Sequence, residues 1–158
     1  MSTSLPSAPA VSAPPSVWPE PPRDWDATRD TFLLWTQVVG KVRMACAPLS
    51  RHWWNVPLYV TARGLTSSLV HHPTGGGFEV EFDLREHQLV VTTTRGEVRR
   101  RPLVAESVAD FHAGVLDLLA GLGLTVEFWP VPVEVPGAVP FAEDTAHAAY
   151  DREQVERF

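Results

Sequence analysis

The segment FAEDTAHAAYD, residues 141–151, concentrates side chains that could do chemistry. Glu143, Asp144 and His147 supply two carboxylates and an imidazole, a set suited to acid–base catalysis or, through Asp144 and His147, to a divalent metal. If they lie on one helical turn, Asp144 and His147 would be neighbours. The structural alternative is that Asp144 caps a single turn and His147 bonds it locally. Asp151 is interpreted separately, as the N-cap of a C-terminal helix, because a glutamine stands at the third helical position.

A second group of candidates lies just before and after the first predicted strand. Trp53 and Trp54 are adjacent, so on extended backbone their rings point to opposite faces, and one of them needs a partner or a ligand. Asn55 follows them, and Arg63 could bind a carboxylate or phosphate with two parallel hydrogen bonds. These four residues are candidates for ligand binding. The alternative is that both tryptophans pack internally and that Arg63 pairs with an acid of this chain.

The remaining polar motifs favour structural roles. His71 and His72 precede PTGGG, which lacks the pattern of a phosphate-binding loop and is interpreted as a hairpin tip. His112 and Cys46 fall in apolar helical runs and are interpreted as core residues. No GxSxG, HExxH or CxxC motif occurs, and the residues identify no cofactor.

Composition narrows the class of protein. The chain has 158 residues, 44% of them apolar, which is ordinary for one globular domain. A net charge of −6 argues against nucleic-acid binding, which needs a basic face. No apolar run is long enough for a membrane span, and no secretory signal is present, so the cytoplasm is the expected location. Twelve arginines against one lysine indicate a GC-rich bacterial genome.

The predicted elements form an α+β domain over residues 18–150, after a disordered Ser/Ala/Pro leader at 1–17. Apolar spacing of three and four predicts one helix from Asp26, capped by Asp24 or Asp26, and a second after the cap Ser107. Gly40 inside the first helix is interpreted as a close packing contact. Period-two alternation predicts strands over residues 56–62, 67–71, 78–84, 88–94, 97–103 and 124–129. Short links favour a mostly antiparallel sheet of five to six strands, covered by two helices in two layers, with a proline-rich exit.

Several segments in this order resemble a bacterial family catalogued as domain of unknown function 5996. They are WTQVVGKVRMACAP, HWWNVPLYVTARGLT, FEVEFD, SVADFH, WPVPVEVP and FAEDTAHAAYD. The resemblance implies no activity. It does imply that relatives continue further, so residues 151–158 are expected to begin a truncated C-terminal helix. A truncated end would expose an apolar patch near Tyr150–Phe158, and a homodimer through that segment is expected.

Two functions of different classes remain. In the first, a pocket between sheet and helices binds a small molecule or catalyses a reaction, with Trp53, Trp54, Asn55 and Arg63 as its wall and the residues around His147 as its polar end. In the second, the chain is a structural or protein-interaction module without catalysis. The first hypothesis requires the two segments to be neighbours in space.

Overall fold

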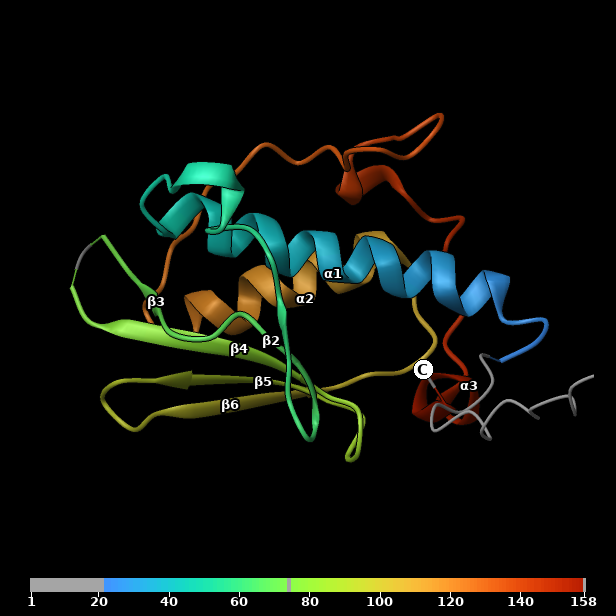
Figure 1. Ribbon diagram of the computed structural model, residues 1–158, viewed down its shortest axis with the longest axis horizontal. Helices are drawn as coiled ribbons and strands as arrows, with labels where there is room; N and C mark the ends of the chain where they lie inside the picture. Colours follow the sequence, from blue (N-terminus) through green and yellow to red (C-terminus); the bar gives the residue numbers. More distant parts are fainter. Residues whose placement is uncertain (1–21, 74, 158) are drawn as a thin grey trace, which may run out of the picture.

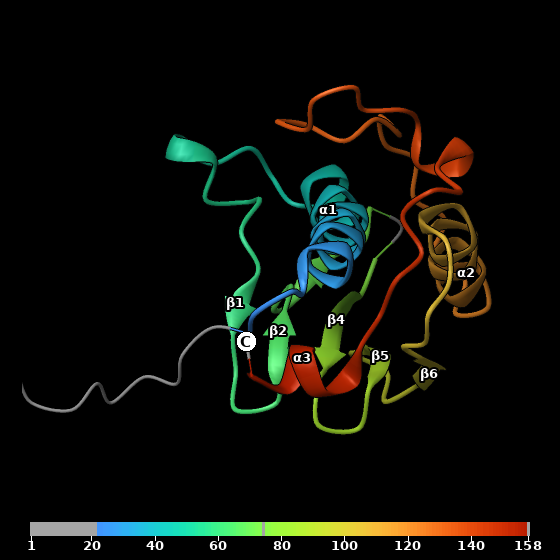
Figure 2. The same ribbon diagram turned by 90° about the vertical axis from the view of Figure 1, so that its right-hand side faces the viewer.

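Two layers make up the molecule in the computed structural model, which describes residues 22–73 and 75–157. One layer is an antiparallel sheet. The other contains two helices, α1 (Asp26–Cys46) and α2 (Val108–Ala120), which lie side by side over the same face of the sheet (Figures 1 and 2). The predicted two-layer α+β architecture is therefore confirmed. The predicted leader at 1–17 lies outside the described residues.

The sheet has six strands within the described part of the chain, and all their pairings are antiparallel. Their order is β1-β2-β4-β5-β6, with β3 also paired to β4. The strands are β1 (Tyr59–Val60), β2 (Gly64–Thr66), β3 (Val70–His71), β4 (Gly77–Asp83), β5 (Gln88–Thr93) and β6 (Val98–Pro102). The strand count falls within the predicted range because Gly64–Thr66, which lies between the first two predicted strands, forms a strand of its own.

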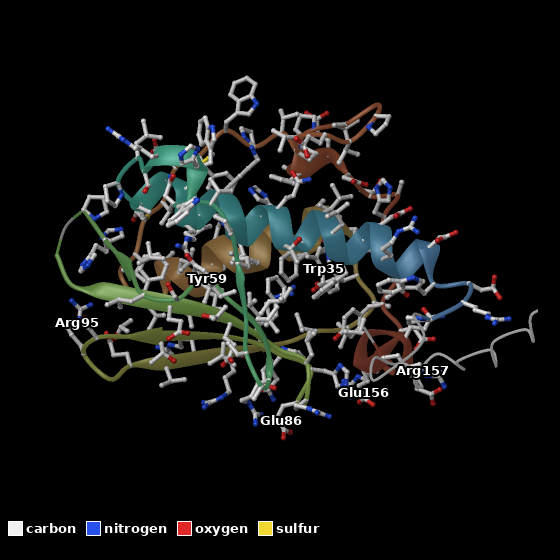
Figure 3. The ribbon with its side chains drawn as sticks, in the orientation of Figure 1. Trp35, Tyr59, Glu86, Arg95, Glu156 and Arg157 are labelled. Carbon is white, nitrogen blue, oxygen red and sulfur yellow. The ribbon has the colours of Figure 1, made fainter. Side chains whose placement is uncertain are left out.

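Alternation along β4 and β5 builds the buried face of the sheet. Val80 pairs with Val91, and Phe82 pairs with Leu89, so apolar side chains from both strands face the helices. Trp35 of α1 stacks on Phe111 of α2 with ring centroids 4.5 Å apart. Phe111 in turn stacks on Phe82 at 6.1 Å, so aromatic rings connect both helices to the sheet. Trp35 lies between the two layers in Figure 3.

The start of α1 differs from the prediction. Its N-cap residue is Trp25, and no side chain bonds the first turn there. The carboxylate of Asp26 instead pairs with Arg29, one turn further on, at 2.6 Å. The N-terminus of α2 agrees with the prediction, because the Ser107 hydroxyl accepts a hydrogen bond from the Asp110 backbone N–H at 3.0 Å.

The strand predicted over residues 124–129 is wrong. This segment has no strand partner, although Leu124, Val126 and Phe128 alternate inward as a strand would. The chain leaves α2 through Gly123, at φ +71°, and crosses the helices instead of adding to the sheet. Phe128 packs on His112 of α2, with ring centroids 5.8 Å apart. Side chains alternate between two sides in any extended segment, whether it lies over helices or within a sheet. The alternation in the sequence therefore could not distinguish these two arrangements.

The chain then crosses the outer side of the helices as a proline-rich strap, residues 130–140 (Figure 1). A bond from the Phe141 N–H to the Pro130 carbonyl, 2.8 Å long, joins its two ends. The last described residues return along α1 and end in the short helix α3 (Arg152–Arg157). Within residues 22–73 and 75–157, no helix combines the length and apolar character needed to cross a lipid bilayer.

Candidate functional site

The segment 144–147 caps the N-terminus of α2. The carbonyls of His147 and Asp144 accept hydrogen bonds from the Val108 and Ala109 backbone N–H groups, both 3.0 Å long. These are donors in the first turn of α2, which has no intrahelical acceptors for them. One carboxylate oxygen of Asp144 accepts from the N–H groups of residues 146 and 147, and the other lies 2.7 Å from His147 Nδ1. The local structural alternative accounts for all of these contacts.

Buried Asp144 is held as a carboxylate by these contacts. Burial by itself would raise the pKa of Asp144, but hydrogen bonds from the His147 backbone and imidazole and from the Ala146 N–H outweigh it. The pKa of Asp144 therefore lies below its ordinary value. Glu143 is exposed and is the last residue of the short turn Phe141–Glu143.

His147 also lines a cavity of about 290 Å³ beneath the strap, together with Asp30 and Glu134. A carboxylate on Nδ1 orients an imidazole as in catalytic pairs. However, the described residues that line this cavity include no hydroxyl or thiol nucleophile. In the described part of the chain, no three His, Cys, Asp or Glu side chains come together as a metal-binding group.

The two tryptophans lie on an exposed arm rather than in the core. Trp53 and Trp54 are 63% and 68% exposed, at the turn Arg51–Trp53, which precedes β1. The interpretation of either ring as internal is wrong, because His52 and Trp53 both adopt positive φ and turn the arm away from the sheet. Asn55 is buried, and its side-chain oxygen accepts a hydrogen bond from the Ser50 N–H at 3.3 Å.

Arg63 is bonded within the chain, as its structural alternative anticipated. Its Nε and one terminal nitrogen both donate to Asp83 Oδ2, at 2.8 and 2.6 Å. Burial would raise the pKa of Asp83, but these bonds and those from the N–H groups of residues 85 and 86 leave it below its ordinary value. Arg63 thereby joins the β1–β2 turn to the end of β4.

The structure does not bring the two predicted groups into one cavity. Arg63 lines a cleft of about 620 Å³ with Val155 and Glu156, near α3. His147 lines the separate cavity under the strap, and the two share no lining residue. In both ribbon views the β1–β2 turn and the segment 141–147 lie at opposite sides of the molecule (Figures 1 and 2).

Three other predicted features have local explanations. Val155 is buried, and Tyr150 stacks on Trp35 at 5.4 Å, so the apolar residues described near the C-terminus pack inside this chain. Phe158 lies outside the described residues. His112 is packed between the rings of Phe128 and Phe141, and burial lowers its pKa. Burial raises the pKa of the Cys46 thiol, which disfavours the nucleophilic thiolate.

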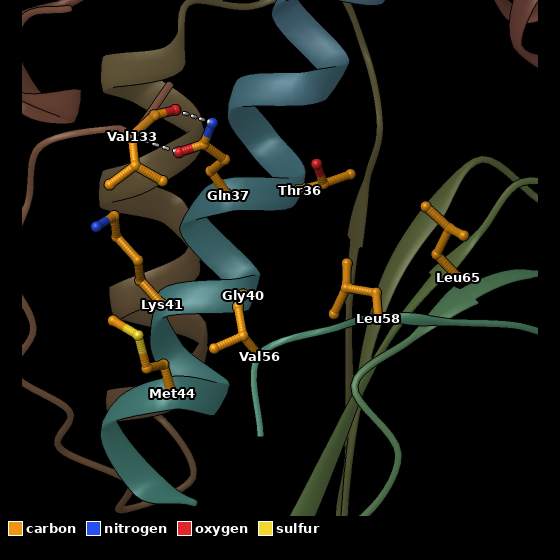
Figure 4. Close-up of a pocket in the computed structure, with 9 residues that line it drawn as sticks. All are labelled: Thr36, Gln37, Gly40, Lys41, Met44, Val56, Leu58, Leu65 and Val133. Carbon is orange, nitrogen blue, oxygen red and sulfur yellow. Dashed lines mark hydrogen bonds between the residues drawn. The ribbon is translucent and has the colours of Figure 1, made fainter. Parts of the chain in front are cut away.

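A groove on the outer side of α1 was not predicted. Its volume is about 350 Å³, within the usual range for small-molecule sites. Figure 4 shows Gln37, Lys41 and Met44 toward the strap residue Val133, and Leu58 and Leu65 on the other side of α1. The lining residues are Thr36, Gln37, Gly40, Lys41, Met44, Val56, Leu58, Leu65 and Val133.

Gly40 forms the floor of this groove. A Cβ atom built on Gly40 would have only the Val56 carbonyl oxygen within 4 Å, at 3.9 Å, which is an ordinary contact. The interpretation of Gly40 as a close packing contact is therefore wrong. Glycine costs about 1 kcal/mol relative to alanine inside a helix. At position 40 the glycine keeps the floor of the groove open, although the packing around it would also accommodate an alanine.

Lys41 contributes a cation without a partner. The residue is only 6% exposed, yet among the residues that the structure describes no hydrogen bond or ion pair reaches its ammonium group. Burial lowers the pKa of Lys41 because it disfavours the charged form. The only fully enclosed side-chain N or O atom without a partner in the described residues is Trp35 Nε1, so the ammonium of Lys41, which lines the groove, keeps some accessible surface.

The other polar side chains of the groove are already bonded. Gln37 donates to the Val133 carbonyl at 2.9 Å and accepts from the Val133 N–H at 2.8 Å, which ties the strap to α1. Thr36 donates to the Leu33 carbonyl at 2.7 Å. Lys41 is therefore the one polar side chain lining the groove that makes no bond among the described residues.

Lys41 lies off the apolar stripe of α1, on the side of the helix that periodicity leaves away from the core. That side is covered by the segment 54–58 and by the strap, two contacts that helical periodicity does not encode. One signal was present in the sequence. Lys41 is the only lysine beside twelve arginines, and it directly follows the only glycine of its helix.

Fold and groove together define a small α+β protein with a helix-covered antiparallel sheet and an open groove on the helical side. Residues 18–158 match the family model described as a family of unknown function, DUF5996. The chain therefore belongs to this family. Comparison with curated proteins and with solved structures finds no match.

Proposed function

We propose that this protein is a cytoplasmic small-molecule-binding protein and that the groove over Gly40 is its ligand site. The observation that carries the proposal is Lys41, a largely buried residue that lines an apolar groove and whose ammonium has no partner in the described chain. A buried cation without a partner is costly, and natural proteins rarely retain one unless it acts on something. A bound ligand would supply the missing contact.

The geometry of the groove supports this proposal in two further respects. Two hydrogen bonds between Gln37 and Val133 hold one rim in place, so the groove does not depend on a ligand to form. Gly40 leaves the floor open at a position where alanine would fit and would stabilise the helix. Both features favour a preformed site over a packing defect.

Thermal unfolding in the presence of a panel of small organic acids, amides, amines and alcohols tests the proposal. Because a ligand that binds only the folded state stabilises it, at least one class should raise the melting temperature. The variant Gly40→Leu places a side chain across the groove floor and should abolish that shift. Gly121→Leu adds the same side chain to an exposed glycine with helical backbone angles at the end of α2, and should preserve it. A shift that survives in Gly40→Leu would remove the groove from consideration.

A second candidate function is protein interaction through the exposed arm at residues 48–54. Leu49, Trp53 and Trp54 together expose apolar surface of the kind that forms binding hot spots. We expect a second copy of this chain to be the partner. Sedimentation velocity of the wild type and of the double variant Trp53→Ser/Trp54→Ser tests this, since the variant should remain monomeric at concentrations where the wild type dimerises. Equal sedimentation of the two proteins would contradict it.

A further inference from the structure

We infer that the ligand of the groove is a monocarboxylate with a short apolar body, and that Lys41 binds its carboxylate. The inference rests on the proposed function and adds the chemical class of the ligand. It follows from the charge, the number of available donors and the shape of the groove.

The charge of the groove comes from one ammonium. Among the residues that line it, Lys41 is the only ionisable side chain, and the remaining residues are apolar or already bonded within the protein. An anion that enters would replace the lost hydration of the ammonium with a charge-assisted hydrogen bond. A cationic ligand would add like charge, and a neutral one would accept a hydrogen bond from the ammonium without neutralising its charge.

The single ammonium group of the groove favours a ligand with a single negative charge. Sites for phosphate usually combine several backbone N–H groups at a helix N-terminus with arginine or lysine side chains. The groove lies along residues 36–44 in the C-terminal half of α1, so the N-terminus of α1 does not point into it. A carboxylate therefore matches the available donors better than a phosphate dianion does.

The shape of the groove indicates where the apolar part of the ligand would lie. Figure 4 shows Lys41 on the Val133 side of α1 and Leu58 and Leu65 on the other, with Gly40 between them. A ligand bonded to Lys41 would cross the helix at the glycine and rest its tail on the two leucines. A second cavity, of about 210 Å³, shares Thr36 and Leu65 with the groove and continues along α1 toward Phe32. Longer tails therefore have further apolar surface to cover.

Calorimetric titration of the purified chain with hexanoate, hexanamide, hexylamine and hexyl phosphate tests the class of ligand. Wild-type protein should bind hexanoate about tenfold or more tightly than hexanamide, because only the carboxylate forms an ion pair with the ammonium. Hexylamine should bind more weakly still. Octanoate should bind more tightly than butyrate. The inference would be overturned if hexyl phosphate bound more tightly than hexanoate, or if hexanamide bound as tightly as hexanoate. In either case the groove would remain a binding site.

The variant Lys41→Met separates recognition from structure. It should lose about tenfold or more in affinity for hexanoate and clearly less in affinity for hexanamide, which loses a hydrogen bond but no ion pair. Arg100→Met, which removes an exposed arginine of β6, is the matched control for the change in net charge and should bind hexanoate as the wild type does. Wild-type affinity of Lys41→Met for hexanoate would overturn the inference.

Because Lys41 is the only lysine of the sequence, its contact with a bound carboxylate can be observed directly. Reductive methylation with ¹³C-formaldehyde labels one lysine side chain, and its NMR shift can be followed against pH. Saturating hexanoate should raise the pKa of the labelled Lys41, because a nearby anion favours the charged form. An unchanged titration with bound hexanoate would show that the acid binds elsewhere. If none of the four compounds binds, and no class in the thermal panel shifts the melting temperature, the groove proposal fails together with the inference.

Discussion

Asp144 and Lys41 are both buried charged residues, and they differ in what surrounds them. The Asp144 carboxylate accepts three hydrogen bonds, all from residues within three positions of it. The Lys41 ammonium has no partner among the described residues. Asp144 stands in the stretch richest in chemically capable side chains, whereas Lys41 stands in an apolar helix. The residue with the less suggestive sequence context is therefore the one with an unused interaction.

The difference shows what a cluster of acids and histidines can mean. In residues 144–147 the polar atoms bond the local backbone and complete the N-terminus of α2. Such capping uses the same residue types as a catalytic site, since both need short polar side chains close to the backbone. A binding site is better indicated by a buried polar group that the chain itself leaves without a partner.

Asp144→Ala should have the largest effect on stability. The substitution leaves the N–H groups of Ala146 and His147 and the imidazole without their acceptor, and it loosens the turn that caps α2. We expect the free energy of unfolding to fall by about 3 kcal/mol. Urea denaturation measures this change. Hexanoate affinity should stay the same, because Asp144 lies outside the groove; a loss of binding without a loss of stability would contradict the structural role.

The same carboxylate should make stability depend on pH in the acid range. The pKa of Asp144 is lower in the folded protein than the ordinary value of about 3.9. Its contribution is therefore complete above about pH 4 and is lost as the pH falls through the depressed value. The difference in unfolding free energy between the wild type and Asp144→Asn should shrink over that range. A constant difference down to pH 2 would contradict the assignment.

Arg43→Met should have the next largest effect, and it is the matched partner of Lys41→Met on the same helix. Arg43 is as buried as Lys41, but its guanidinium donates to the carbonyls of Asn55, Ser67 and Trp54 and lies over the Tyr59 ring. Its loss leaves buried carbonyls without donors. We expect destabilisation by about 2 kcal/mol in urea denaturation. Stability equal to the wild type would mean that these bonds have no net value.

The sequence predicts the fold better than it predicts the site, for a physical reason. The strands and helices follow from local patterns: FEVEFD alternates, and Ser107 caps α2, whatever packs against them. The groove instead depends on four separate segments of the chain, which are α1, residues 56–58, β2 and the strap. Contacts of that kind have no period. The unusual pair Gly40-Lys41 was the one local trace of the groove.

Gly40→Ala should stabilise the protein by about 0.5–1 kcal/mol, since alanine is the better helix former and its methyl group meets nothing closer than 3.9 Å. Thermal unfolding without ligand measures this gain. Hexanoate should bind more weakly to the variant, because the methyl group narrows the groove floor. A variant that is destabilised would indicate a packing requirement at Gly40 that the geometry does not show.

Lys41→Met should have the smallest effect and the opposite sign from Arg43→Met. Methionine preserves the apolar stem and removes a charge that burial penalises, so we expect the free energy of unfolding to rise by about 0.5 kcal/mol at pH 7.

This difference should depend on pH. Because the folded pKa of Lys41 lies below its ordinary value of about 10.4, the wild type gains stability as the pH rises between the two values. The advantage of Lys41→Met should therefore shrink toward pH 10.5 in urea denaturation at both pH values. A lysine with a structural partner would behave in the reverse manner: its replacement would destabilise the protein at pH 7, and the loss would diminish as the lysine became neutral. The sign of this one difference thus separates a lysine that awaits a ligand from one that, like Arg43, is already bonded.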